Sequence, residues 1–404
     1  MVTIKGGVTA PQGFKASGTA AGLKKNGDLD LALVYSEDTC VTLGVYTTNV
    51  VKGHSLQVTA ENLKKGYANA VLINSGGANA CVGRQGYLDA KEITEYCAEK
   101  LNIAPEHMLI GSTGVIGYPL KKDLINAGID KLTGDFSNQE NENGGNLAAK
   151  AIMTTDTFPK EIAVDLVLDG KHVKIGAMAK GSGMIHPNMA TMISIITTDA
   201  NISRKTLEPM FRKIVGKTYN RVSIDGDTSV CDMTLIFANG LSNDTVIEEG
   251  SESYEKYSEA LEYVCTELAR MLAKDGEGAT KLLEIQVKNA ITAEDAYKIV
   301  VSVAKSPLVK TAVFGEDANW GRIITAAGYS GAKFNPETVD IFIGGVKMCE
   351  NGKALPFDEE KAKEALHKDE ILVTIDLKAG EFFDRMWTCD FSYDYVKING
   401  SYRS

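Results

Sequence analysis

The sequence contains few of the residues that build common metal and disulfide sites. It has five histidines in 404 residues, and no two of them lie three or four positions apart, as paired zinc ligands on a helix do. Its seven cysteines are an odd number, widely scattered and without a C-x-x-C pair. That pattern is typical of reduced thiols in a cytosol. We therefore expect no metal site and a cytoplasmic protein.

Long apolar runs and an excess of positive charge are also absent. No run of eighteen apolar residues occurs, and the first eighteen residues lack the character of a targeting segment. Acidic residues outnumber basic ones by 53 to 43, which gives a formal net charge of -10. Nucleic acids and anionic lipids select basic surfaces, so we expect small-molecule partners and neither nucleic acid nor membrane.

What is present is a mixture of short strands and helices. Strands are predicted at 31–37, 41–48, 68–77, 161–170, 171–180 and 281–290, and residues 107–117 are predicted as a buried strand that ends in a glycine loop. Helices are predicted at 88–101, 147–156, 253–274 and 293–306, and the tail from residue 341 is predicted to be mostly strand. Adjacent strands are as frequent as alternating strands and helices. The predicted fold class is therefore α/β, a layered sandwich of β-sheets covered by helices.

The glycine-rich stretch GSTGVIG, residues 111–117, is the first candidate for chemistry. Its G-x-x-G-x-x-G spacing matches neither a P-loop nor a dinucleotide-binding loop. A glycine loop after a buried strand can direct backbone N–H groups at one oxygen, and Thr113-Gly114 is suited to hold a developing oxyanion. On these residues alone, an ordinary tight turn remains the alternative.

The second candidate is the junction in KGSGMIHPNMATMISII, residues 180–196, where a glycine-rich approach meets an apolar strand at Thr191. Threonine is common at the start of a strand because it is β-branched. Alternatively, the Thr191 hydroxyl attacks the carbonyl of Ala190, and hydrolysis of the resulting ester releases Thr191 as a new N-terminus. A terminal threonine carries its own base, because an α-amine has an ordinary pKa of about 8.

Several further segments occur in the same chain as these two candidates. They are NSGGANAC (74–81), TTD (154–156), DGDTS (225–229), AKDGEGATK (273–281), FGEDANWGR (314–322) and YVKINGSYRS (395–404). Together, over essentially the whole sequence, they resemble the ornithine acetyltransferase family, the glutamate N-acetyltransferases of arginine biosynthesis. The resemblance implies a fold similar to that of N-terminal-nucleophile hydrolases. It also implies self-cleavage between Ala190 and Thr191 into an α chain, 1–190, and a β chain, 191–404, which assemble as an α2β2 heterotetramer.

The same resemblance assigns roles to individual residues. Thr191 would be the nucleophile, and Thr113 and Gly114 the oxyanion donors. Substrate contacts would come from Thr154, Lys180, Thr191, Glu277, Asn399 and Ser404. The residue types suit this chemistry, since a lysine can meet a substrate carboxylate and a glutamate a substrate amine. The implied reaction moves the acetyl group of N2-acetylornithine to glutamate through acetyl-Thr191, without a cofactor or a metal.

Other functions remain open at this point. A bifunctional enzyme would also accept acetyl-CoA as a co-substrate and make N-acetylglutamate directly. A self-processing aminopeptidase of similar fold and an uncleaved amino-acid-binding protein are weaker alternatives. Asp225 and Asp227 in DGDTS are expected to form a structural turn, with only a weak case for a divalent ion. We expect DGDTS and FGEDANWGR to shape the walls of the pocket.

Overall fold

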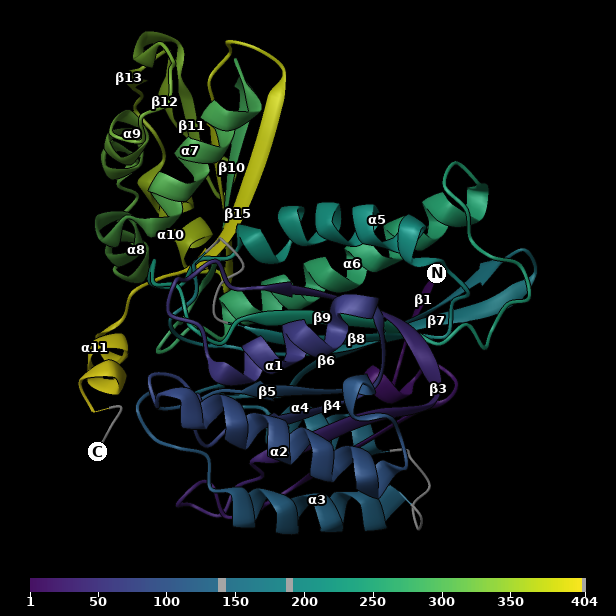
Figure 1. Ribbon diagram of the computed structural model, residues 1–404. Coiled ribbons are helices and arrows are strands. Elements are labelled where there is room, and N and C mark those ends of the chain that lie inside the picture. The colour runs from purple at the N-terminus through teal and green to yellow at the C-terminus, as the bar shows by residue number, and fades with distance from the viewer. Residues whose placement is uncertain (137–142, 187–191, 402–404) are drawn as a thin grey trace. The chain divides into compact units, whose positions relative to one another are not determined.

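A computed structural model of the chain describes residues 1–136, 143–186 and 192–401 (Figure 1). The described residues fall into two compact units. Unit 1 comprises those within Met1–Gly181, Asn188–Asn220 and Thr228–Leu268, and unit 2 those within Ser182–Pro187, Arg221–Asp227 and Ala269–Ser404. This division by packing does not follow the expected 190/191 boundary between two chains, which stays a prediction. No helix within the described ranges is long and apolar enough to cross a membrane.

Unit 1 is built on a nine-stranded sheet. Its strands are β1 (Val2–Ile4), β2 (Phe14–Thr19), β3 (Leu31–Tyr46), β4 (Tyr67–Asn74), β5 (Met108–Ser112), β6 (Lys160–Leu168), β7 (Lys171–Lys180), β8 (Ile193–Thr198) and β9 (Met233–Ala238). The order is β1-β6-β7-β8-β9-β3-β4-β5, and β2 also pairs with β3. Asp169 and Gly170 form the turn between β6 and β7, and both have positive φ angles, of 49° and 78°.

One expectation for this sheet was wrong. The separate strands predicted at 31–37 and 41–48 are a single 16-residue strand, β3. The exposed residues Glu37, Asp38 and Thr39 interrupt its apolar pattern, but the backbone continues through a register shift between Tyr35 and Cys40. The first part of β3 pairs with β2 and β4 and the last part with β9. The long strand therefore joins the two halves of the sheet.

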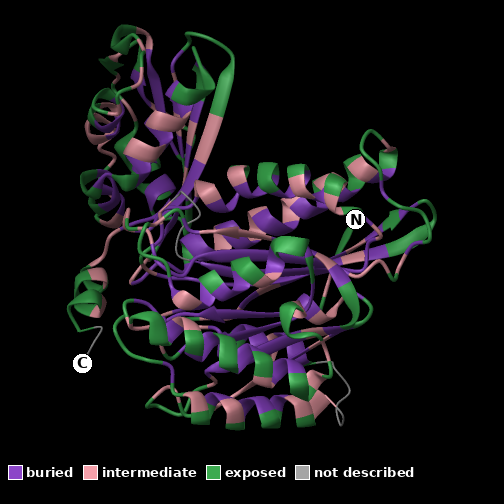
Figure 2. Ribbon diagram, viewed as in Figure 1, coloured by how far each residue is buried: buried purple, intermediate pink, exposed green. Residues whose placement is uncertain are grey.

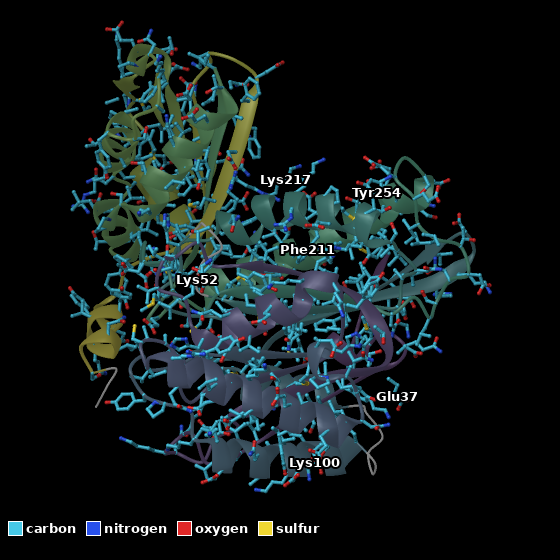
Figure 3. The ribbon with its side chains drawn as sticks, viewed as in Figure 1. Glu37, Lys52, Lys100, Phe211, Lys217 and Tyr254 are labelled. Carbon is cyan, nitrogen blue, oxygen red and sulfur yellow. The ribbon has the colours of Figure 1, made fainter. Side chains whose placement is uncertain are left out.

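Six helices of the described chain pack on the sheet of unit 1. They are α1 (His54–Asn62), α2 (Arg84–Leu101), α3 (Lys122–Phe136), α4 (Gly144–Ala151), α5 (Arg204–Lys217) and α6 (Glu252–Lys274), whose last turns belong to unit 2. In Figure 1, α2 and α3 lie beyond β4 and β5, and α5 and α6 lie along β8 and β9. Each helix is buried on one side and exposed on the other (Figure 2). On α5, for example, Phe211 is buried and Lys217 is exposed (Figure 3).

The core confirms the predicted layering. One face of β4 packs its Leu72 against α2 and α3, through side chains such as Ile93 and Ile129. The opposite face packs Ile73 against Ile193 and residues of β9. Side chains alternate along a strand, so its two faces point in opposite directions. In each half of the sheet, one face packs against helices and the opposite face packs against the other half. The arrangement in unit 1 is a sandwich of sheets covered by helices.

Unit 2 contains a six-stranded sheet of order β13-β12-β11-β14-β10-β15. Its strands are β10 (Leu282–Ala290), β11 (Asp340–Ile343), β12 (Val346–Glu350), β13 (Lys353–Ala354), β14 (Glu370–Asp376) and β15 (Phe382–Cys389). Its helices are α7 (Ala293–Lys305), α8 (Pro307–Phe314), α9 (Trp320–Gly328), α10 (Glu359–Leu366) and α11 (Tyr393–Gly400). The apolar side of α7, with Ile299 and Val303, packs on this sheet.

The tail of the chain is less extended than expected. Residues from 341 onward include two helices, α10 and α11, among the predicted strands. Each begins at a side-chain cap that overrides the neighbouring strand pattern. Asp358 accepts a hydrogen bond from the backbone N–H of Lys361, and Ser392 accepts one from that of Asp394.

Candidate active site

The loop after β5 holds Thr113 and Gly114 in a defined conformation. The N–H of Thr113 donates to the carbonyl oxygen of Asn74 at 2.9 Å. Gly114 has a φ of +123°, and a Cβ atom at this position would lie 2.9 Å from the backbone nitrogen of Gly77. Only glycine tolerates both the backbone angle and the close approach. The two glycine-rich segments of the sequence thus pack against each other, which local turn chemistry alone does not require.

A buried polar network supports this loop. The Ser112 hydroxyl donates to Oδ1 of Asn74 at 2.6 Å, and Nδ2 of Asn74 donates to the carbonyl oxygen of Gly77 at 2.9 Å. The hydroxyls of Ser112 and Ser55 are 2.7 Å apart. A connected network of this kind restricts the geometry of the groups above it. Sequence reasoning missed Ser55 because it lies 57 residues from Ser112 and in no glycine motif.

Lys180 comes next to Thr113 although 67 residues separate them. Lys180 ends β7, where it pairs with Ile193 at the start of β8, two positions after Thr191. Its side chain is buried, and its Nζ donates to Oγ1 of Thr113 at 3.4 Å. Because this oxygen accepts from the ammonium group, the hydroxyl proton of Thr113 is directed elsewhere. The pair can therefore present both a donor hydroxyl and a positive charge to a ligand.

The carboxylate of Asp156, in the TTD segment, binds the backbone of Thr154 and that of Gly181, next to Lys180. Oδ2 of Asp156 accepts from the N–H of Thr154 at 2.9 Å, and Oδ1 accepts from the N–H of Gly181 and from Nζ of Lys160, both at 2.7 Å. Burial opposes ionisation of this carboxyl, but the charges of Lys180 and Lys160 outweigh it and hold the pKa of Asp156 at about 2. The backbone at Thr154 and beside Lys180 is thus tied to one charged group.

Asp232 is a buried acid that sequence reasoning missed. It directly precedes β9, and the neighbouring N–H of Met233 donates to the carbonyl oxygen of Met192 at 2.9 Å. Asp232 is 1% exposed, so its carboxyl group is shielded from water. Burial raises the pKa of Asp232 well above its usual range, and the charge of Lys180 opposes that rise. Its only sequence signal is an acidic residue at the start of an apolar strand.

In unit 2, Glu277 and Asn399 come together. Nδ2 of Asn399 donates to Oε2 of Glu277 at 2.8 Å, and the N–H of Glu277 donates to the carbonyl oxygen of Ser182 at 2.9 Å. A Cβ atom on Gly183 would collide with the Glu277 carboxylate, so glycine at this position makes room for the acid. Helix α11 carries Asn399 to this contact from 122 residues away in sequence.

The segment before the predicted cleavage point is bound to DGDTS, also within unit 2. Met184, with a φ of +55°, donates its N–H to Oδ2 of Asp225 at 2.6 Å, and Ile185 donates to Oδ1 at 3.0 Å. Asp225 also accepts from the N–H of Asp227 at 3.2 Å, as in the expected turn. No group of three metal-ligating side chains was found among the described residues. Through its three hydrogen bonds, Asp225 holds the backbone of Met184, Ile185 and Asp227 in place.

His186 lies in the same segment. Its Nδ1 is 3.2 Å from the hydroxyl oxygen of Ser223. Burial, aided by the charge of Lys305, lowers the pKa of His186 to about 4. The imidazole is therefore neutral near pH 7.

The predicted site residues thus form two described groups. Thr113, Gly114, Thr154 and Lys180 gather in unit 1, and Glu277 and Asn399 gather in unit 2. Ala190, Thr191 and Ser404 lie outside the described residues. The roles of all nine remain predictions.

Comparisons with known proteins identify the family. The model of the ArgJ family matches residues 15–404. The chain belongs to the ArgJ family. It is 49% identical to the arginine biosynthesis bifunctional protein ArgJ of Caldanaerobacter subterraneus subsp. tengcongensis and 46% identical to the glutamate N-acetyltransferase of Methanocaldococcus jannaschii, with 100% of each chain covered in both cases.

A solved structure of a relative agrees with the fold of this ArgJ-family chain. The crystal structure of arginine biosynthesis bifunctional protein argJ from Bacillus halodurans is 41% identical, with a TM-score of 0.51 over 52% of this chain and 99% of that chain. The predicted family and its layered α/β fold are therefore confirmed.

Proposed function

We propose that this ArgJ-family chain transfers the acetyl group of N2-acetylornithine to glutamate through an acetyl-Thr191 intermediate. Its relatives are named for arginine biosynthesis and for glutamate N-acetylation, and the chain is accordingly an acyltransferase of that pathway. The observation that carries the proposal for the site is the contact between Lys180 and Thr113. It joins a cation and a hydroxyl donor beside the strand that follows Thr191.

Self-cleavage precedes transfer in this proposal. The Thr191 hydroxyl attacks the carbonyl carbon of Ala190, the peptide C–N bond breaks, and the Ala190 acyl group becomes an ester on Thr191. Water then hydrolyses the ester. The products are the chains 1–190 and 191–404, and the α-amine of Thr191 becomes available as a base.

In the transfer, that α-amine takes the hydroxyl proton as Oγ1 of Thr191 attacks the acetyl carbonyl. The hydroxyl of Thr113 and the N–H of Gly114 donate to the developing oxyanion. Collapse breaks the amide bond, and the departing amine of ornithine takes the proton. The amine of glutamate then attacks the acetyl ester by the reverse sequence. One amide replaces another, so the proposed exchange requires neither a cofactor nor a metal.

Substrate recognition follows the charges of the two groups. We assign Lys180 and Thr154 to the substrate carboxylate, and Glu277, oriented by Asn399, to the side-chain ammonium of ornithine. Ser404 completes the proposed substrate contacts. Assembly of the two chains as an α2β2 heterotetramer and a cytoplasmic location also belong to the proposal.

Acetyl-CoA is a second candidate donor. It is favoured by the word "bifunctional" in the name of the Caldanaerobacter relative. Acetyl transfer to glutamate should therefore be assayed separately with N2-acetylornithine and with acetyl-CoA. Transfer from N2-acetylornithine alone would exclude the second activity, and transfer from neither would refute the proposed function.

A denaturing gel tests the nucleophile. The 43.4 kDa chain should give fragments of about 20 and 23 kDa, as expected for a self-formed terminal nucleophile. The Thr191→Ala variant should remain at full length, because it has no hydroxyl to attack Ala190. A single band for the wild type, or two bands for the variant, would contradict the mechanism.

A further inference from the structure

Asp156 and Lys160 form an ion pair that is completely buried in unit 1. Oδ1 of Asp156 and Nζ of Lys160 are 2.7 Å apart, and both side chains are 0% exposed. Removing two charges from water is unfavourable, and apolar residues of similar volume often replace such pairs without loss of stability. Stability alone therefore does not explain why this ion pair is present. Its position in the fold suggests a different role.

The position is between the two segments that carry the proposed carboxylate-binding residues. Asp156 accepts the backbone N–H of Thr154 on one side and that of Gly181, next to Lys180, on the other. The backbone before Thr154 is held separately, since Nζ of Lys24 donates to the carbonyl oxygen of Met153 at 2.8 Å. Asp156 thus fixes the separation between Thr154 and Lys180.

The ammonium groups around this loop differ in what they contact. Lys24, Lys160 and Lys180 face three carboxylates, Asp156, Asp30 and Asp28, and Asp30 accepts three backbone N–H groups from residues 21, 23 and 24. Lys160 lies directly on Asp156, whereas Lys180 donates to Thr113.

We propose that Asp156, neutralised by Lys160, is a positioning residue that fixes Thr154 and Lys180 and leaves the Lys180 ammonium to bind the α-carboxylate of the substrate. The inference rests on the proposed function, in which the substrates are α-amino acids. It adds that Lys160 determines selectivity for a carboxylate without touching the ligand. Without Lys160, the negative charge of Asp156 would compete with the substrate for Lys180.

The test measures preference for a carboxylate by calorimetry, which does not require turnover. Binding of ornithine, which carries no acetyl group to transfer, is compared with that of ornithinamide, for the wild type and for Lys160→Met, Asp156→Asn and the double variant. We expect the wild type to prefer the carboxylate by about tenfold or more, as a charge-assisted contact implies. In Lys160→Met the preference should fall to about twofold, and in steady-state assays KM should change more than kcat.

The double variant keeps the test valid if a single variant fails to fold. It removes both charges, so the buried site should tolerate it. An asparagine offers one acceptor oxygen and an NH2 group to the two N–H donors, so Thr154 and Lys180 lose their common anchor and the preference should still fall. Asp199→Asn is the matched control. Asp199 is also buried and accepts two backbone N–H groups, from Gln12 and Lys174, at the other end of β7 and β8.

The outcomes separate this inference from the proposed function. A wild-type preference in the double variant, or an equal loss in Asp199→Asn, would overturn the role of Asp156. If the wild type prefers the carboxylate but transfers no acetyl group, the proposed reaction fails and the binding role of Asp156 is still measured. A wild type that binds the two ligands equally would refute the inference directly.

Discussion

The two groups of predicted site residues are held in different ways. In unit 1, Thr113 and Lys180 lie at the ends of β5 and β7, and buried charges and backbone hydrogen bonds fix them. In unit 2, Glu277 follows a long helix and meets Asn399 from the short helix α11, which has no buried residue. Strand ends in a core hold groups more precisely than loops and terminal helices do. The first group suits the reacting carbonyl and the substrate carboxylate, and the second suits recognition of the substrate ammonium.

This difference predicts where each substitution acts. Changes at Thr113 or Gly114 in unit 1 should reduce the rate of acetyl transfer, because an oxyanion donor acts in the transition state. Changes in the unit 2 group should raise KM for one substrate and leave self-cleavage intact, because cleavage involves no free substrate. A substitution that violates this separation would show that the two groups share their roles.

The largest effect is expected for Thr113→Val, which keeps the shape and removes the hydroxyl donor. Loss of one oxyanion donor should lower kcat by about 100- to 1,000-fold. The backbone bond from Thr113 to Asn74 is unaffected, but the buried ammonium of Lys180 loses an acceptor, so the melting temperature should fall by a few degrees. Thr218→Val removes a buried hydroxyl at the C-cap of α5 that donates to the carbonyl oxygen of Ile214, and it is the matched control. A Thr113→Val enzyme with the kcat of the control would exclude an oxyanion role for this hydroxyl.

The sequence predicted the elements of unit 1 better than their contacts. The loop at Thr113 and the strand ending in Lys180 could be placed because glycine turns and apolar runs are local signals. The buried network of Ser55 and Ser112, and the proximity of Asp232 to Lys180, could not. These contacts join residues tens of positions apart, on elements that are distant in sequence: α1 with β5, and the end of β7 with the start of β9.

Some elements that were not predicted do have a recognisable apolar pattern in the sequence. Helix α3 buries Ile125, Ile129 and Leu132 at helical spacing, a signal that was present but not recognised. The short helix α9, which begins within FGEDANWGR, is different. It begins at an Asn319 cap and has nine residues, so its periodicity is too brief to distinguish it from a loop. The boundary between units at Gly181 lies in the glycine-rich approach to Thr191, which was interpreted only as part of a cleavage site.

A smaller effect is expected for Glu277→Gln, on substrate recognition. The change removes a charge but keeps an oxygen to accept from Asn399. Loss of a charge-assisted contact with the ornithine ammonium should raise KM for N2-acetylornithine by about tenfold or more. KM for glutamate, which has no such ammonium, should change less, and the cleaved bands should persist. Asp394→Asn, an exposed site on α11, is the control. An uncleaved Glu277→Gln chain would contradict the separation.

The smallest effect is expected on the stability of unit 2 at acidic pH, through the protonation of His186. The pKa of His186 is about 4 in the folded chain against an ordinary value of 6.5, so between these values the unfolded chain binds a proton that the folded chain does not. Its contribution is therefore constant above pH 6.5 and becomes destabilising as the pH falls toward 4. Asp156 in unit 1, with a pKa of about 2, stays charged throughout this window. Lowering the pH from 6.5 to 4 should thus reduce the stability of unit 2 through His186.

The measurement compares melting temperatures at pH 7.5 and 5. His186→Asn keeps an acceptor for the Ser223 hydroxyl and cannot be protonated, so it should lose a few degrees less than the wild type on acidification. Lys305→Met sharpens the test, because removing that charge takes away one of the two causes that lower the pKa of His186. Its acid response should lie between those of the wild type and His186→Asn. If all three chains respond equally, acid sensitivity arises elsewhere, and the two units do not differ in this respect.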